Sequence, residues 1–149
     1  MSEQAREALV NHPNLIFQRD SQRLDLLDVT VTQTGLIALL QYLCIEKNHP
    51  IELTAVKTDH HDDSYLGEHC HFNGYCADLW PLSAPSAGDY LAAGEGAFQS
   101  FLRDVAQAPT LFQIGLAGTA QTSYNDAAAG PTVFDDDGAD HVHVGAVNP

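Results

Sequence analysis

The feature that most constrains the fold is the apolar stretch TQTGLIALLQYLCIEKNH, residues 32–49. Its spacing places one set of residues on a single helical face, and these are Leu36, Leu39, Leu40, Leu43 and Cys44. Pro50 is expected to end this helix, because proline cannot continue a helical hydrogen-bond pattern. The segment IELTAVKT, residues 51–58, then alternates apolar and polar residues, which predicts a strand.

The remaining chain predicts further helices and strands in a mixed order. We expect a helix at residues 2–11 capped by Ser2, short strands at 14–18 and 75–80, and a helix at 86–108 capped by Ser86. The apolar face of that last helix holds Leu91, Phe98, Leu102 and Val105. Strands are expected at 110–117 and 141–147, on either side of a long loop, residues 117–140. A loop of this length in a compact domain is usually functional or disordered. This one ends directly at HVHV, which favours a functional role.

This order predicts an α+β domain with helices packed on one side of a largely antiparallel sheet. The chain has 149 residues, 44% of them hydrophobic, which suits a single domain with a sizeable core. We expect one domain over 1–149, with an N-terminal extension at 1–29 and the core at 30–147.

Charge and hydropathy argue against two classes of partner. Twenty acidic residues against six basic ones give a net charge of −14, which repels nucleic acid and anionic membranes. No apolar run reaches the length of about 18 residues that a membrane span needs, and no signal peptide is visible. We therefore expect a protein that is cytoplasmic until it is released or carried on a virion.

Three cysteines are too few for a disulfide scaffold. Cys44 lies on the apolar helical face and is expected in the core. Cys70 and Cys76 could pair, but the missing secretory signal leads us to expect both thiols to be reduced.

Two short stretches, EHCHFNGYCADLW at 68–80 and DHVHVG at 140–145, hold four of the eight histidines. Zinc is usually bound by a few His, Cys or carboxylate side chains. A loop carrying His71 could double back at Gly74, because glycine permits a tight approach, and meet Asp78 on the next strand. His143 would then arrive from a separate strand as a third ligand.

Other interpretations of these residues stay open. A structural zinc knot could use Cys70, His71, Cys76 and His69, although the Cys-x5-Cys spacing is not that of common zinc fingers. The histidines could also simply belong to a polar loop. The acidic run FDDDGAD, residues 134–140, lacks the alternating ligands of a calcium loop and is interpreted as a turn. Trp80 is expected in the core.

The stretch HCHFNGYCADL resembles the pattern His-x-x-Gly-x-Ala-x-Asp of the zinc D-Ala-D-Ala carboxypeptidase and L-alanyl-D-glutamate endopeptidase family, which is related to the Hedgehog signalling domain. His71, Gly74 and Asp78 match the pattern, and Cys76 stands where alanine is usual. The pair Asp140 and His143 resembles the family's acidic residue three positions before its last ligand.

The resemblance implies a Zn²⁺ ion held by His71, Asp78 and His143, with Asp140 as the general base. His141 shares a strand face with His143 by alternation, so it could contact substrate or support the ligands. The family commonly has an arginine near the substrate, and no arginine lies between Arg23 and Arg103 here. Lys57 or His60 would have to replace it.

Taken together, these features predict a zinc metallopeptidase that cleaves stem or cross-link peptides of peptidoglycan, as a phage-like or bacterial lysin module. The alternative is a non-catalytic zinc domain of the same fold in a larger assembly such as a virion. A metal-free globular domain is a third hypothesis. The expected partners are peptidoglycan peptides and a larger phage or cell-wall assembly.

Overall fold

The structure is a computed structural model that describes residues 2–60, 70–83, 95–115, 132–134 and 141–148. Its helices are α1 (Glu3–Val10), α2 (Asp20–Leu27), α3 (Thr34–Gln41), the π-helical turn η1 (Tyr42–Glu46) and α4 (Glu95–Ala106). Its strands are β1 (Leu15–Phe17), β2 (Ile51–Ala55), β3 (Cys76–Pro81), β4 (Leu111–Gly115), β5 (Thr132–Phe134) and β6 (Val142–Ala146).

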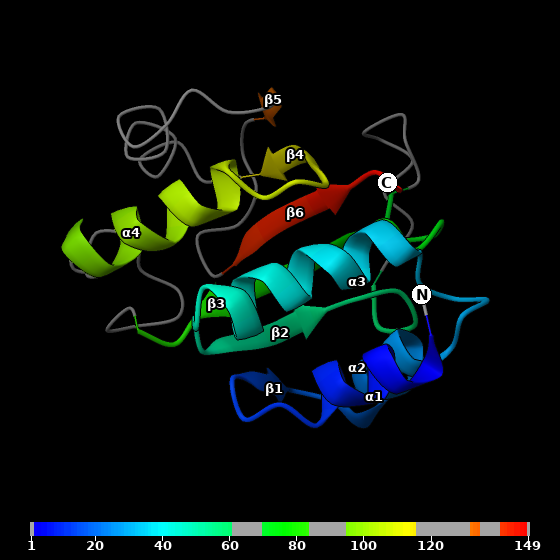
Figure 1. Cartoon of the computed structure of the whole chain (residues 1–149). Coiled ribbons are helices and arrows are strands. Elements are labelled where there is room, and N and C mark those ends of the chain that lie inside the picture. Colours follow the sequence, from blue (N-terminus) through cyan, green and yellow to red (C-terminus); the bar gives the residue numbers. More distant parts are fainter. Residues whose placement is uncertain (1, 61–69, 84–94, 116–131, 135–140, 149) are drawn as a thin grey trace.

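The strands form one open sheet in the order β1-β2-β3-β6-β4-β5 (Figure 1). The three central pairings, β2 with β3, β3 with β6 and β6 with β4, are antiparallel. The two outer pairings, β1 with β2 and β4 with β5, are parallel. The predicted α+β class with a mostly antiparallel sheet is therefore confirmed. The sheet also brings β6, from the end of the chain, beside β3.

Helix α3 lies across the middle of the sheet, as Figure 1 shows. All five residues of the predicted apolar face, which continues from α3 into η1, are buried. They belong to one core cluster that also includes Ala77, Leu79, Val142 and Val144 from the central strands. The start of the helix approaches the chain beyond β6 very closely. A Cβ atom added to Gly35 would lie 2.1 Å from the carbonyl oxygen of Val147, so only glycine fits there.

The N-terminal residues belong to the same core. Ser2 caps α1 as predicted, its hydroxyl accepting from the amide N–H of Ala5 at 3.2 Å. Leu9, Leu15 and Leu26 are buried in the core cluster, and β1 pairs with β2. The residues expected as an N-terminal extension therefore form one edge of the sheet through β1 and contribute to its hydrophobic core.

The structure differs from the sequence-based expectations in three local features. Helix α2 lacks a clear apolar repeat and was not expected. Strand β5 lies within the segment expected to be an irregular loop, and it pairs with β4. The helical stretch after α3 ends at Glu46, before Pro50, and Asn48 turns the chain with φ 59°. None of the helices in the described ranges is long and apolar enough to cross a membrane.

Candidate metal centre

The side chains of three residues predicted from the sequence lie next to one another and are buried. Asp78 on β3 and His143 on β6 are direct neighbours in the antiparallel ladder. His71 lies in the turn that precedes β3. The exposed fractions of His71, Asp78 and His143 are only 1%, 5% and 2%. Two polar strand residues and a polar turn residue are thus buried together. The free-energy cost of burying them must be offset by the interactions that they make with one another or with a bound group.

The ligand-type atoms of these residues form a nearly equilateral triangle. Asp78 Oδ1 lies 3.1 Å from His143 Nδ1 and 3.3 Å from His71 Nε2. The two histidine nitrogens are 3.2 Å apart. Two ligands of a tetrahedral zinc ion, each at 2.0–2.1 Å, are separated by about 3.3–3.4 Å. The spacing of the three atoms therefore suits one zinc-sized cation.

The outer hydrogen bonds of both histidines orient their lone pairs toward this triangle. His71 Nδ1 lies 2.6 Å from the carbonyl oxygen of Val56, which can only accept, so this nitrogen carries the proton. His143 Nε2 lies 3.2 Å from Gln113 Oε1, which likewise accepts. In neutral imidazoles the inward nitrogens, His71 Nε2 and His143 Nδ1, are then acceptors.

Three acceptors that face one another at about 3.2 Å repel each other unless a positive charge lies between them. A single proton can bridge only one pair of the three atoms, whereas a divalent cation satisfies all three. The chemistry of this donor set therefore fits a metal ion. His71 and Asp78 form, with His60, a group that could hold a metal ion. The short distances from His143 to both residues are compatible with the predicted ligand set of His71, Asp78 and His143.

The carboxylate of Asp78 is stabilised in its charged form. Burial alone would raise the pKa of the Asp78 carboxyl, but hydrogen bonds with His143, His60 and His71 hold this pKa well below its usual value. These bonds form when the imidazoles carry a proton on the nitrogen that faces Asp78, and a bound cation would take the place of that proton. The group is thus ready to bind a cation over the whole neutral range.

The turn that carries His71 depends on Gly74. Gly74 has φ +78°, and an added Cβ would lie 2.0 Å from the carbonyl oxygen of Val31. Its amide N–H donates to the carbonyl of His71 at 3.0 Å, and its own carbonyl accepts from the amide of Gln33 at 2.9 Å. The predicted requirement for glycine is therefore confirmed, and the reason is both backbone conformation and contact with the chain before α3.

A disulfide joins Cys70 and Cys76 across the same turn, with their Cα atoms 5.3 Å apart. The amide of Tyr75 donates to the carbonyl of Cys70 at 3.0 Å, which folds the chain back and brings the two cysteines together. The expectation that both thiols are reduced was wrong, because this turn brings the two cysteines together in a disulfide. Together with His143, these sulfurs also form a group that could hold a metal if the thiols were free.

The segment after β2 supports the centre from the other side, and Asp25 of α2 fixes it. The buried Asp25 carboxylate accepts from the amides of Lys57 and Thr58 at 3.1 Å and 2.8 Å. It also accepts from the Thr58 hydroxyl at 2.6 Å. These bonds position the carbonyl of Val56, which in turn orients His71.

Asp59 anchors the same segment to the start of α2. Its carboxylate accepts from the amide of Val56 at 2.9 Å, from Gln22 at 2.8 Å and from Arg19 at 3.0 Å. Burial alone would raise the pKa of the Asp59 carboxyl, but these hydrogen bonds hold it below its usual value. The next residue, His60, is thereby held near the centre.

His60 and His141 both approach the second oxygen of the Asp78 carboxylate. The Nε2 atoms of His60 and His141 lie 3.2 Å and 3.8 Å from Asp78 Oδ2. The sequence raised His60 only as a substitute for an arginine, and Gln113 was missed. Only the strand order shows that His60 and Gln113 lie near the centre. His60 follows β2, which pairs with β3, and Gln113 lies on β4, which pairs with β6.

The structure describes only some of the other predicted residues. Asp140, His69 and the acidic run FDDDGAD beyond Phe134 lie outside the described residues, as do Ser86 and Leu91. The ammonium of Lys57 lies 5.5 Å from the ring centre of Phe72. Trp80 is buried, as expected, and stacks on Phe98 with ring centres 5.6 Å apart.

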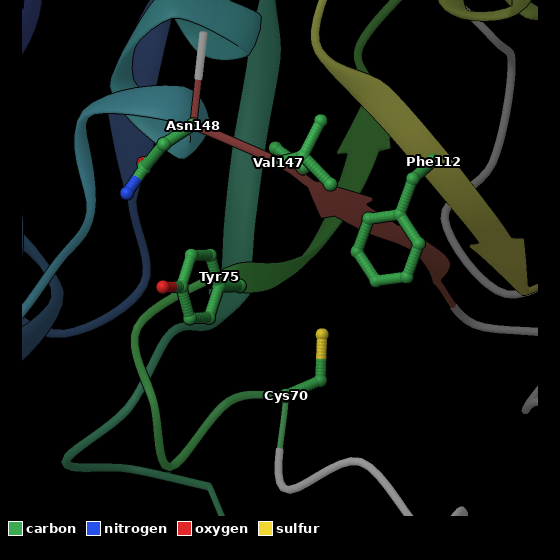
Figure 2. A pocket seen from close by; sticks show the side chains of 6 residues that line it. Cys70, Tyr75, Phe112, Val147 and Asn148 are labelled. Carbon is green, nitrogen blue, oxygen red and sulfur yellow. The ribbon is translucent and has the colours of Figure 1, made fainter.

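An apolar pocket of about 360 Å³ lies beside the turn that carries His71 (Figure 2). The residues lining it are Cys70, Tyr75, Phe112, Ala146, Val147 and Asn148. A Cβ atom on Gly145 would lie 3.0 Å from the ring of Phe112 and 3.1 Å from Gln113 Oε1. One wall of the pocket therefore adjoins the residue that orients His143.

Neither a scan against protein-family models nor a search of curated proteins found a match to this chain.

Proposed function

We propose that this chain is a zinc-dependent peptidoglycan peptidase that cleaves stem or cross-link peptide bonds, as a phage-like or bacterial lysin module. The observation that carries the proposal is the triangle of inward-facing acceptors formed by His71, Asp78 and His143. These are the residues that the resemblance to the D-Ala-D-Ala carboxypeptidase and endopeptidase family assigns to zinc. The proposal includes the family's Hedgehog-like fold, with the helices on one side of the sheet.

Each residue then has a role that its position supports. His71, Asp78 and His143 would hold the Zn²⁺ ion, and Val56 and Gln113 would keep the two imidazoles in the binding tautomer. Zinc at this position would supply Lewis-acid chemistry, which activates water and polarises a peptide carbonyl.

The residues around the ion would handle substrate and protons. Asp140, three positions before His143 in the sequence, would act as the general base. The apolar pocket beside Cys70 suits a small methyl-bearing side chain, as in the alanine residues of a stem peptide. His141, with Nε2 near Asp78, and Lys57 would contribute to substrate contact.

A second candidate is a zinc-binding domain of the same fold without catalytic activity, acting as a structural or binding part of a larger phage or cell-wall assembly. The absence of any arginine between Arg23 and Arg103 favours it. The Lys57 ammonium, which lies over Phe72, cannot offer the planar fork with which arginine grips a carboxylate.

Digestion of purified peptidoglycan separates these candidates. The zinc-loaded chain should release new amine termini, and the Asp140→Ala variant should release few or none while it still binds zinc. A wild-type chain that holds zinc but releases no termini from several peptidoglycan types would favour the non-catalytic domain. A chain that binds no zinc would overturn both.

A further inference from the structure

The carboxylate of Asp78 is contacted on both of its oxygens. Oδ1 faces His71 and His143, which form the buried centre. Oδ2 faces the Nε2 atoms of His60 and His141. The proposed function uses Asp78 Oδ1, His71 and His143 as ligands. It gives no ligand role to Asp78 Oδ2, His60 and His141.

The two distances on the Oδ2 side are informative. His60 Nε2 is 3.2 Å from Oδ2, which suits either a hydrogen bond or two ligands on one ion. His141 Nε2 is 3.8 Å away, which is too long for a hydrogen bond. Two ligands at 2.0–2.1 Å from one cation are about 3.2 Å apart at an angle of about 100° and about 3.8 Å apart at about 135°. Both distances therefore fit ligands of a common cation.

The fold fixes these side chains in place. His60 follows β2, Asp78 lies on β3 and His141 directly precedes β6, and β3 pairs with both of the other strands. The His60 ring stacks on the His71 ring, with centres 3.6 Å apart and an interplanar angle of 10°. His60 is thus held by the first centre and by the anchored segment before it.

The Oδ2 side is also more accessible than the buried centre. The side chains of His60 and His141 are 23% and 19% exposed, compared with 1% for His71. An ion bound there could enter from solvent and keep positions open for water or a substrate oxygen.

We propose that Asp78 bridges two divalent cations. The first ion lies among Asp78 Oδ1, His71 and His143, and the second is bound by Asp78 Oδ2, His60 Nε2 and His141 Nε2. The second ion is zinc or a similar imidazole-binding metal, held more weakly because fewer of its ligands are buried. It would bind an anionic oxygen of the substrate, such as a carboxylate, a role for which the chain offers no arginine between Arg23 and Arg103. The two-ion site requires the first centre, but it does not require peptidase activity.

Metal stoichiometry tests the proposal. The full chain, stripped of metal with a chelator, is titrated with Zn²⁺ by calorimetry, and bound zinc is counted by mass spectrometry after equilibrium dialysis. The wild type should bind two equivalents, one tight and one weaker. The double variant His60→Ala/His141→Ala should bind one tight equivalent, and His141→Gln alone should weaken only the second.

A matched control is His12→Ala, because His12 hydrogen-bonds to the amide of Asn14 far along the chain from the metal ligands. This variant should keep both equivalents. A wild type that saturates at one equivalent overturns the proposal, and so does a second equivalent that persists in the double variant, because that ion is adventitious.

A second measurement does not depend on variants. With two equivalents of Co²⁺, ions about 3.5–4 Å apart should couple magnetically and lose electron paramagnetic resonance intensity relative to one equivalent. Uncoupled spins at full loading would refute a bridging Asp78. Loss of the second site with retained one-zinc peptidase activity would leave the proposed function standing, whereas the absence of any bound zinc would overturn both.

Discussion

Gly74→Ala is the substitution for which the structure predicts the largest effect relative to its chemical size. The change adds one methyl group at the turn that carries His71. Gly74 has φ +78°, and the new Cβ would lie 2.0 Å from the backbone carbonyl oxygen of Val31. Neither the backbone angle nor the contact can be relieved by turning a side chain.

The magnitude follows from two separate costs. An alanine in the left-handed region costs about 1–2 kcal/mol relative to a favourable conformation. Overpacking against a fixed neighbour costs about 1–3 kcal/mol more. The free energy of unfolding should therefore fall by about 2–5 kcal/mol, a large part of the 5–15 kcal/mol typical of a domain. Zinc affinity should also fall, because the Gly74 amide holds the carbonyl of His71.

Urea denaturation of the metal-free and zinc-loaded chains measures both effects. Ser100→Ala is the control, because Ser100 is exposed within α4, where alanine is a better helix former than serine. That variant should be as stable as the wild type or slightly more stable. If Gly74→Ala changed the free energy of unfolding by less than about 0.5 kcal/mol, the assigned backbone conformation and its contact with Val31 would be wrong.

Three further predictions concern the support of the centre. In a chelator-competition assay, Gln113→Leu should weaken zinc binding about 10–100-fold, because His143 loses the acceptor that sets its tautomer. Gln113→Glu keeps an acceptor and should retain most of the affinity, so equal zinc affinities in both variants would contradict this reasoning. Replacing Cys70 and Cys76 by serine should lower the free energy of unfolding by about 2 kcal/mol, since the disulfide closes a short loop. Wild type unfolded in urea with a reductant should match the variant. An identical urea midpoint for the variant and the oxidised wild type would count against the disulfide. Because the pKa of Asp59 is lowered in the folded state, its contribution to stability should be present above about pH 4, near the unfolded pKa, and be lost as pH falls through the folded pKa. The difference in the free energy of unfolding between wild type and Asp59→Asn should therefore shrink in acid. A difference that stays constant down to about pH 2 would refute the assignment.

Much of the local structure was predictable because it depends on short-range patterns. The buried face of α3, the Ser2 cap and the alternating residues of β2 were all read correctly from spacing and residue type. Helix α2 was missed because its apolar residues do not repeat along one face. Strand β5 was missed because a three-residue strand in a Gly- and Asp-rich segment carries no pattern of its own.

The sequence by itself determined the ligand-type residues and the need for glycine between them, since His71, Gly74 and Asp78 lie close together in one motif. Only the tertiary structure decided that His143 is the direct strand neighbour of Asp78, because pairing between β3 and β6 joins segments far apart in the chain. It also decided which atoms orient the imidazoles, since Val56 directly follows β2, Gln113 lies within β4, and neither residue carries a metal-binding signal. The second pair of histidines around Asp78 arises for the same reason: the neighbours of a central strand are set by sheet order, which short-range patterns do not specify.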